Sequence, residues 1–218
     1  MDKSTQYQAV VFDFDGTLVD SRQFILESLS LLVKRLKNED MSMEEIDKIY
    51  EPSVEVMISR LGLPWDSDEE KALTQQQWAL LARSEGKKVT PFPMATRLLT
   101  SLEEVGYDLY LWTARDRAST LQVMENHGMT RFFKDIRCAD DTALSKPSPQ
   151  GMEELVGKLD KSKVCLIGDS EADKKGAQNF GCDFLGACWD SRAQLEIDEN
   201  VKKHFSSINK IEEFFIKE

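Results

Sequence analysis

The chain has 218 residues, of which 41% are hydrophobic, so it can bury a sizeable core as one domain or as a domain with a smaller insertion. Its 39 acidic side chains outnumber the 28 basic ones and give a formal net charge of −11. This balance argues against binding to nucleic acid or to anionic membrane surfaces, both of which reward clusters of Lys and Arg. Anionic small molecules stay open as ligands, because the local charge of a cleft decides their binding.

Cysteine and histidine usage narrows the class of protein further. The four cysteines include no Cys-x-x-Cys pair and there are only two histidines, a usage that disfavours zinc and favours free thiols in a reducing compartment. The N-terminal residues Met1 to Gln8 are polar, and no segment reaches transmembrane length. We therefore expect a cytoplasmic protein that contacts neither membrane nor nucleic acid, with a monomer as the default oligomeric state and a dimer as the alternative.

The most informative stretch begins with an apolar, strand-like run at residues 9–12. Asp13 and Asp15 follow it, and because alternate residues of an extended backbone point to the same side, we expect their carboxylates to converge beyond the strand. Two neighbouring carboxylates repel, so the pair needs a cation or a shared proton. Gly16 lets the backbone turn sharply and approach a ligand closely, and Thr17 adds a hydroxyl; both are candidates for binding phosphate.

Residues 21–89 contain no convincing strand. Helical patterns cover three ranges: 22–37, 42–61 (interrupted by Pro52) and 67–84. The simplest organisation is a helical insertion at 21–89 within a core formed by residues 1–20 and 90–218. An insertion that leaves from the Asp-rich loop is well placed to act as a lid.

Strands and helices alternate through the rest of the chain. Strand-like runs lie at residues 109–112, 135–138, 164–167 and 184–189. Helix-like segments lie at residues 94–105, 116–127, 149–159 and 171–180. This alternation predicts an α/β fold with a doubly wound parallel sheet. Such sheets bind ligands in the crevice at the carboxyl ends of their strands.

Two further segments place polar groups at that edge of the predicted sheet. The strand at 109–112 is followed by Thr113, whose hydroxyl is suited, together with the backbone N–H of Ala114, to holding phosphate oxygens. Lys146 precedes Pro147, which favours an extended backbone at the lysine. Its ammonium could then project towards a neighbouring strand end.

The last segment adds more negative charge at the same edge. A strand ends just before Asp169, and Asp173 follows in the first turn of the next helix, beyond Ser170. With Asp13 and Asp15 these aspartates make four carboxylates against one lysine. That imbalance calls for a divalent cation, and an all-oxygen set of ligands favours Mg²⁺.

The four segments, in this order, resemble the four motifs of the haloacid dehalogenase superfamily of aspartyl phosphotransferases. They are Asp-Phe-Asp-Gly-Thr at 13–17, a strand ending in Thr113, Lys146 ahead of Pro147, and Gly-Asp-Ser-Glu-Ala-Asp at 168–173. The helical insertion resembles the C1 cap of the phosphoglycolate phosphatase and β-phosphoglucomutase-like subgroup. The resemblance covers nearly the whole chain and implies a Rossmann-like core with a C1-type cap.

The resemblance also implies the chemistry of the aspartates. Asp13 corresponds to the nucleophile that forms an aspartyl-phosphate intermediate, and Asp15 to the general acid and base. Mg²⁺ would be held by Asp13, by Asp169 and by the backbone carbonyl of Asp15. The implied activity is Mg²⁺-dependent hydrolysis of small phosphate monoesters.

Other residues are implied to bind phosphate or to support the site. Thr113, with Ala114 beside it, and Lys146 correspond to the residues that hold the phosphate, and Lys146 also neutralises the nucleophile. Asp173 and Ser170 are implied to support the site without contacting the metal directly, or through water.

Alternatives to a phosphatase remain open at this point. A phosphomutase of the β-phosphoglucomutase type shares all four motifs, and a catalytically silent phosphate-binding module would share the fold. A dehalogenase fits poorly, because those relatives lack the aspartate found here at Asp15. The partner is expected to be a small phosphorylated metabolite. Arg60, Trp65, Trp78 and Arg115 are candidates to contact it, but no substrate signature is recognisable.

Overall fold

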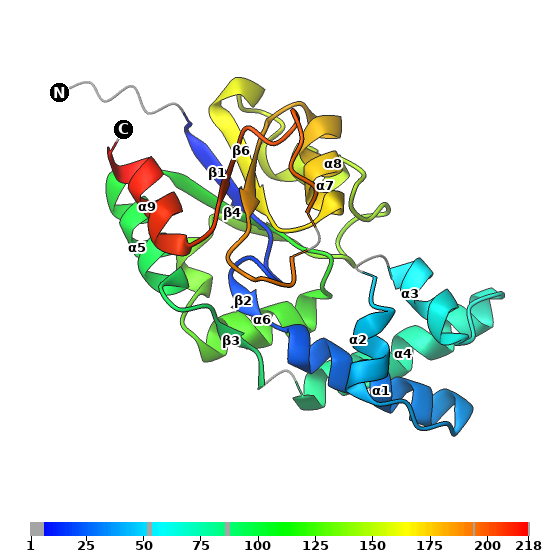
Figure 1. Ribbon diagram of the computed structural model, residues 1–218. Coiled ribbons are helices and arrows are strands. Elements are labelled where there is room, and N and C mark those ends of the chain that lie inside the picture. Colours follow the sequence, from blue (N-terminus) through cyan, green and yellow to red (C-terminus); the bar gives the residue numbers. More distant parts are fainter. Residues whose placement is uncertain (1–6, 52–53, 86–87, 194, 218) are drawn as a thin grey trace. The chain divides into compact units, whose positions relative to one another are not determined.

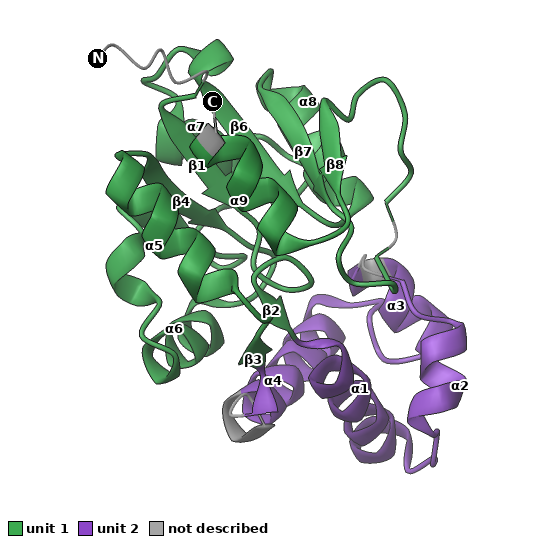
Figure 2. Ribbon diagram, turned by 60° about the vertical axis from the view of Figure 1, so that its left-hand side comes forward, with its two compact units in different colours: residues 1–20, 90–218 green, residues 21–89 purple. Residues whose placement is uncertain are grey.

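The structure is a computed structural model that describes residues 7–51, 54–85, 88–193 and 195–217. The chain forms two units: Met1–Asp20 together with Thr90–Glu218 is unit 1, and Ser21–Val89 is unit 2 (Figure 2). Unit 2 is the segment expected to form a helical insertion. Pro52 and most of the polar N-terminal segment, on which two expectations depend, lie outside the described residues.

Unit 1 is built on a six-stranded sheet in the order β5-β4-β1-β6-β7-β8, with every neighbouring pair parallel. Its strands are β1 (Ala9–Phe12), β4 (Asp108–Trp112), β5 (Asp135–Arg137), β6 (Val164–Gly168), β7 (Asp183–Ala187) and β8 (Lys203–Phe205). Every residue of β1 is buried, as is typical of a parallel strand covered on both faces. The predicted doubly wound parallel sheet is confirmed.

Helices cover both faces of this sheet (Figure 1). They are α5 (Ala95–Val105), α6 (Arg117–Asn126), α7 (Gln150–Val156), α8 (Glu171–Phe180) and α9 (Ile208–Lys217), with 3-10 turns at Thr130–Phe132 and Lys161–Lys163. On one face, Val11 and Trp112 of the sheet pack with Met152 of α7 and Phe180 of α8. Helices α5 and α9 lie against each other on the opposite side.

Several short elements are absent from the sequence-based prediction. Strand β2 (Val19–Asp20) pairs antiparallel with β3 (Thr90–Pro91), so the chain pairs with itself where unit 1 gives way to unit 2 and where it resumes. Strands of two or three residues, β8 included, are too short to show a period of two. Helix α9 is also absent from the prediction. It buries Ile208, Ile211 and Phe215 on one face, and this spacing indicates a helix in the sequence.

Unit 2 consists of helices packed around their own core. They are α1 (Arg22–Lys37), α2 (Met43–Lys48), α3 (Val54–Leu61) and α4 (Asp68–Glu85). All four contribute buried apolar side chains, among them Leu32, Ile46, Leu61 and Leu81. Trp65 and Trp78 pack against this core, and Arg60 donates to the carbonyl oxygen of Ile49 at 2.8 Å. None of the described helices is long and apolar enough to cross a membrane.

Replacing Leu166 with Ala tests how much the central strands stabilise unit 1. Leu166 is 0% exposed in β6, between β1 and β7. We expect Leu166→Ala to lower the free energy of unfolding by about 2–5 kcal/mol, because a cavity is left in addition to the lost apolar burial. Urea unfolding followed by circular dichroism measures the change.

The matched control is Leu144→Ala, whose side chain is 62% exposed. This variant should alter the free energy of unfolding by less than about 0.5 kcal/mol. Equal losses at the two positions would contradict the assignment of Leu166 to the core.

Candidate active site

The carboxyl ends of the central strands carry the polar residues singled out from the sequence. Phe12, the last residue of β1, lies opposite Leu111 of β4 and Ile167 of β6. The backbone bonding continues past the strand end, since the N–H of Asp13 donates to the carbonyl of Ile167 at 2.8 Å. The residues that follow the three strands are therefore held side by side, as expected for parallel strands.

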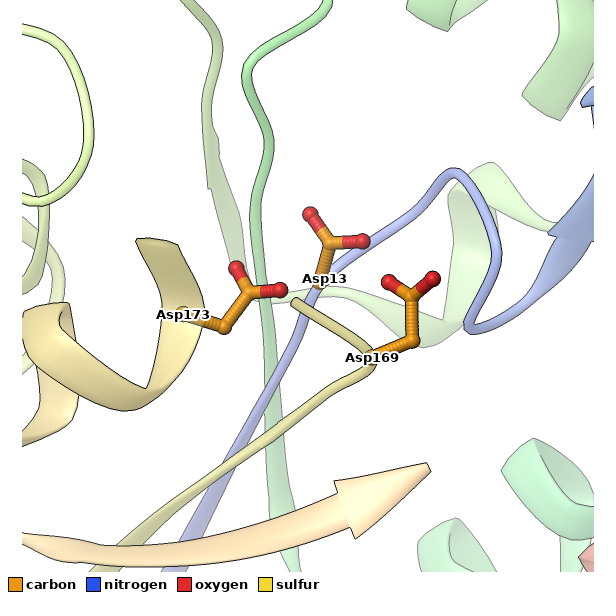
Figure 3. Close-up of side chains that lie close together, drawn as sticks. All are labelled: Asp13, Asp169 and Asp173. Carbon is orange, nitrogen blue, oxygen red and sulfur yellow. The ribbon is translucent and has the colours of Figure 1, made fainter. Parts of the chain in front are cut away.

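Three carboxylates meet at this edge (Figure 3). Asp13 follows β1, Asp169 follows β6, and Asp173 lies in the first turn of α8. Each offers an oxygen atom, and these atoms lie within 4.8 Å of one another. Asp13 and Asp173 are buried, at 6% and 1% exposed, while Asp169 is partly buried.

Lys146 is inserted between two of these carboxylates. Its Nζ lies 2.6 Å from Asp13 Oδ1 and 2.6 Å from Asp173 Oδ1, and its side chain is only 3% exposed. The peptide bond between Lys146 and Pro147 is cis. The side-chain amide of Asn179 on α8 donates to the Pro147 carbonyl at 2.9 Å, which ties the lysine loop to the helix that carries Asp173.

Burial and the crowding of negative charge both shift the pKa values of this site. Burial, reinforced by the charge of Asp173, raises the pKa of Asp13 to about 7 despite the neighbouring ammonium. Burial and the charge of Asp13 also raise the pKa of Asp169 well above its ordinary value. Burial opposes the charge of Lys146, yet Asp13 and Asp173 raise its pKa above the ordinary value, so this side chain is a cation. A divalent cation would supply the missing charge.

Ser170 and Asp173 form a capping box at the start of α8. The Asp173 N–H donates to Ser170 Oγ, while Asp173 Oδ2 accepts from both the N–H and the hydroxyl of Ser170. Because Oδ1 accepts from Lys146, both oxygens of Asp173 are engaged. The helix start thus orients the carboxylate that anchors the lysine.

Two glycines make room for the carboxylates. A Cβ at Gly16, where φ is +81°, would lie 2.1 Å from Asp169 Oδ2, and a Cβ at Gly168 would lie 2.5 Å from the Cβ of Asp173. Neither distance is compatible with a side chain larger than hydrogen unless the aspartate moves. Gly16 therefore serves both the turn and the close approach expected of it.

The carboxylate of Asp15 turns to a different partner from the one expected. Arg115 binds it with two hydrogen bonds, Nε to Oδ2 at 3.0 Å and Nη2 to Oδ1 at 2.5 Å. Strand β1 ends at Phe12, so the alternation that would align Asp13 with Asp15 no longer applies. Asp15 still raises the pKa of Asp13, as the smallest of the contributions.

Arg115 is a candidate substrate contact by sequence, but the sequence did not reveal its pairing with Asp15. Its side chain is 6% exposed. Burial opposes its charge, but the charge and hydrogen bonds of Asp15 and the charges of the nearby Asp116 and Asp13 together raise the pKa of the guanidinium. Its backbone N–H donates to Thr113 Oγ1 at 3.1 Å. The only available signal was its position two residues after Thr113.

The remaining candidates lie around the same edge. Thr113 is buried after β4, and Ala114 beside it is exposed. Thr17 is fully buried, with its hydroxyl 3.5 Å from Asp169 Oδ1. The Thr17 carbonyl accepts a hydrogen bond from the indole of Trp189 at 3.1 Å. The candidate residues of unit 1 therefore belong to the loops at the carboxyl ends of β1, β4 and β6, to the lysine loop before α7, or, for Asp173, to the first turn of α8. The candidates Arg60, Trp65 and Trp78 belong to unit 2.

This fold and site define a Rossmann-like protein with an acidic centre at the strand ends. The family model of haloacid dehalogenase-like hydrolases matches residues 10–187, and the chain belongs to that family. A phosphoglycolate phosphatase of Vibrio parahaemolyticus is 26% identical over 186 residues, covering 81% of this chain and 82% of the relative. Pyrophosphatase PpaX of Bacillus pumilus is 26% identical over 206 residues, covering 94% and 91%.

Solved structures share the fold. A haloacid dehalogenase-like protein of Bacteroides fragilis superposes with a TM-score of 0.82 at 23% identity, over 94% of this chain and 99% of that one. YfnB of Bacillus subtilis, solved bound to magnesium, superposes with a TM-score of 0.74 at 20% identity, over 97% and 99%.

Removing the Arg115 guanidinium tests the strength of its pair with Asp15. We expect Arg115→Met to lower the free energy of unfolding by about 1–3 kcal/mol, because a partly buried carboxylate loses two charged hydrogen bonds. Urea unfolding at neutral pH measures it. In the control Arg131→Met, the lost pair with Glu103 is exposed and 3.4 Å long, so the change should stay within about 0.5 kcal/mol.

Two outcomes would count against this pairing. One is an Arg115→Met protein as stable as the control. The other is an Arg115→Met effect that is undiminished when Asp15 is already Asn, since the two residues would then contribute independently.

Proposed function

We propose that the chain is a Mg²⁺-dependent phosphatase of small phosphate monoesters that works through phosphorylated Asp13. The observation that carries the proposal is the buried Asp13 carboxylate with the Lys146 ammonium 2.6 Å away. A carboxylate attacking phosphorus meets a negatively charged group, so charge compensation at the nucleophile is what the reaction requires.

The first half-reaction transfers the phosphoryl group to the protein. An oxygen of Asp13 forms a bond to phosphorus as the bond between phosphorus and the ester oxygen breaks. Lys146, the Thr113 hydroxyl and the backbone N–H of Ala114 hold the phosphate oxygens. Asp15 gives a proton to the leaving alkoxide.

The second half-reaction returns the protein to its starting state. Asp15 accepts a proton from a water molecule, whose oxygen attacks phosphorus, and the bond to Asp13 breaks with release of inorganic phosphate. Arg115 donates one hydrogen bond to each Asp15 oxygen here, so the proton transfers use the second lone pair of these oxygens or follow a turn of the carboxylate away from the guanidinium.

The acidic centre fits Mg²⁺. Among the described residues, the group that could hold a metal ion consists of three carboxylates, which share one ammonium, and carboxylate oxygens are ligands that Mg²⁺ prefers. Asp13, Asp169 and the backbone carbonyl of Asp15 would hold the ion, while Asp173 is engaged by Lys146 and Ser170. When bound, Mg²⁺ supplies positive charge beside the transferring phosphoryl oxygens and orients them.

The substrate is proposed only as a class. The relatives are named for phosphoglycolate and for pyrophosphate, which share a phosphate group and little else. Unit 2 enters the chain directly after the loop that carries the aspartates, at the position from which a lid would enclose a small leaving group.

The central test is phosphate release from p-nitrophenyl phosphate and a panel of small phosphomonoesters. We expect release with Mg²⁺, none with EDTA, and recovery when Mg²⁺ is added in excess. Asp13→Asn should lower kcat by at least about 1,000-fold, because the nucleophile is lost. Asp40→Asn, at an 87% exposed side chain, is the matched control and should retain full activity.

Failure would take a recognisable form. No release from any ester by a folded, Mg²⁺-supplemented protein would contradict the phosphatase. Isomerisation of a sugar phosphate under those conditions would then identify a mutase, and its absence would leave a silent binding module.

Asp15→Asn separates the two half-reactions. The p-nitrophenolate group leaves without needing a proton, so phosphorylation of Asp13 should proceed while its hydrolysis, which lacks a base, stalls. We expect rapid-quench experiments to show a burst of about one nitrophenolate per protein followed by slow turnover. An alkyl phosphate, whose alkoxide needs the proton, should give no burst. Unchanged steady turnover of both substrates would rule out this role of Asp15.

A further inference from the structure

Trp112, the last residue of β4, lies directly beneath the lysine of the site. Its side chain shares a face of the sheet with Val11 and packs among residues of α7 and α8. Lys146 Nζ lies over the indole ring, 4.8 Å from its centroid. Trp112 is 3% exposed and so is the Lys146 side chain, so water does not screen this contact.

The helices on this face are shaped around the indole. A Cβ at Gly151 of α7 would lie 2.2 Å from Trp112 Nε1, and a Cβ at Gly176 of α8 would lie 2.6 Å from Cη2. Both glycines lie inside helices, where glycine weakens the backbone relative to alanine. Two helical positions thus carry glycine, which lowers helix stability, and the indole of Trp112 fills the space that they leave.

The indole of Trp112 contacts the Lys146 ammonium in addition to the two carboxylates. Asp13 and Asp173 each accept a hydrogen bond from Lys146, so the charge is held from two directions. The ring is the third neighbour, and the electron-rich face of an indole attracts a cation. Because α7 and α8 enclose the indole, the ring holds a fixed position beneath the Lys146 ammonium.

We propose that Trp112 is a positioning residue for Lys146. Its ring holds the ammonium where it can contact both Asp13 and the phosphate group of the substrate. This inference rests on the proposed function for its catalytic consequence, because Lys146 is there the group that binds phosphate. The alternative is that Trp112 only fills space in the core.

The kinetic test compares Trp112→Leu and Trp112→Phe with Phe184→Leu. Phe184 belongs to the same buried cluster as Trp112 and has no described role at the site. With p-nitrophenyl phosphate and Mg²⁺, Trp112→Leu should lower kcat/KM about tenfold and raise the inhibition constant of inorganic phosphate several-fold. Trp112→Phe, which keeps an aromatic face, should recover most of the loss, and Phe184→Leu should leave both constants unchanged.

These readouts separate positioning from packing. A smaller fraction of folded protein lowers kcat but leaves KM and the phosphate inhibition constant where they were. Melting temperatures of all three variants show how much of any change is structural. If Trp112→Leu and Phe184→Leu lose activity alike, with the phosphate constant unmoved, Trp112 is core filling and the inference is wrong.

A second measurement needs no catalysis at all. Trp112→Leu and Lys146→Met are combined in a double-mutant cycle of urea unfolding, followed by circular dichroism. We expect the two changes to be coupled, with Trp112→Leu costing less when the ammonium is gone. The pair Phe184→Leu and Lys146→Met should add independently.

The two proposals fail separately. If no ester is hydrolysed but the cycle shows coupling, the function is wrong and the contact between Trp112 and Lys146 stands. If the protein is an active phosphatase, and the cycle is additive with the phosphate constant unchanged in Trp112→Leu, the function stands and the positioning role is overturned.

Discussion

Lys146 places one ammonium 2.6 Å from both Asp13 and Asp173, in a site where all three side chains are almost completely withdrawn from water. Taking a single charge out of water costs several kcal/mol, and only close, well-oriented partners offset that cost. Three carboxylates share one lysine, and burial, reinforced by the charge of Asp173, raises the pKa of Asp13. The site therefore attracts a cation and an electrophile, and its buried charges are less favourable before these bind than afterwards.

The fold offsets this free-energy cost by holding the charged side chains in fixed orientations. Parallel strands deliver Asp13 and Asp169 to one edge, and backbone hydrogen bonds continue beyond the strand ends. The first turn of α8 fixes Asp173 through Ser170, and the same helix holds the lysine loop through Asn179. Since the strand ends and α8 orient all four charged groups, little reorganisation is left for the moment of reaction.

Much of this arrangement could be predicted because it follows from short-range rules. Apolar runs followed by Asp13, Thr113 and Asp169 mark strand ends, and parallel strands bring their ends together. The direction of Asp15 could not be predicted, because it depends on where β1 stops and on Arg115, 100 residues away. The glycines that face Trp112 were equally hidden, since a missing side chain leaves no pattern in a sequence. Strands as short as β2 and β8 carry no period to detect.

Gly16 and Gly168 have a consequence for how such a sequence changes over generations. Each faces an aspartate so closely that a methyl group there would displace the acid. A side chain at position 168 would meet the Cβ of residue 173, an atom that every residue except glycine carries, so this glycine is required even where the acid has been replaced. Gly16 lies at a φ of +81°, so a side chain there is strained even where Asp169 has become small. A lineage that loses one of the acids therefore keeps the glycine opposite it, and a single substitution is enough to regain the carboxylate.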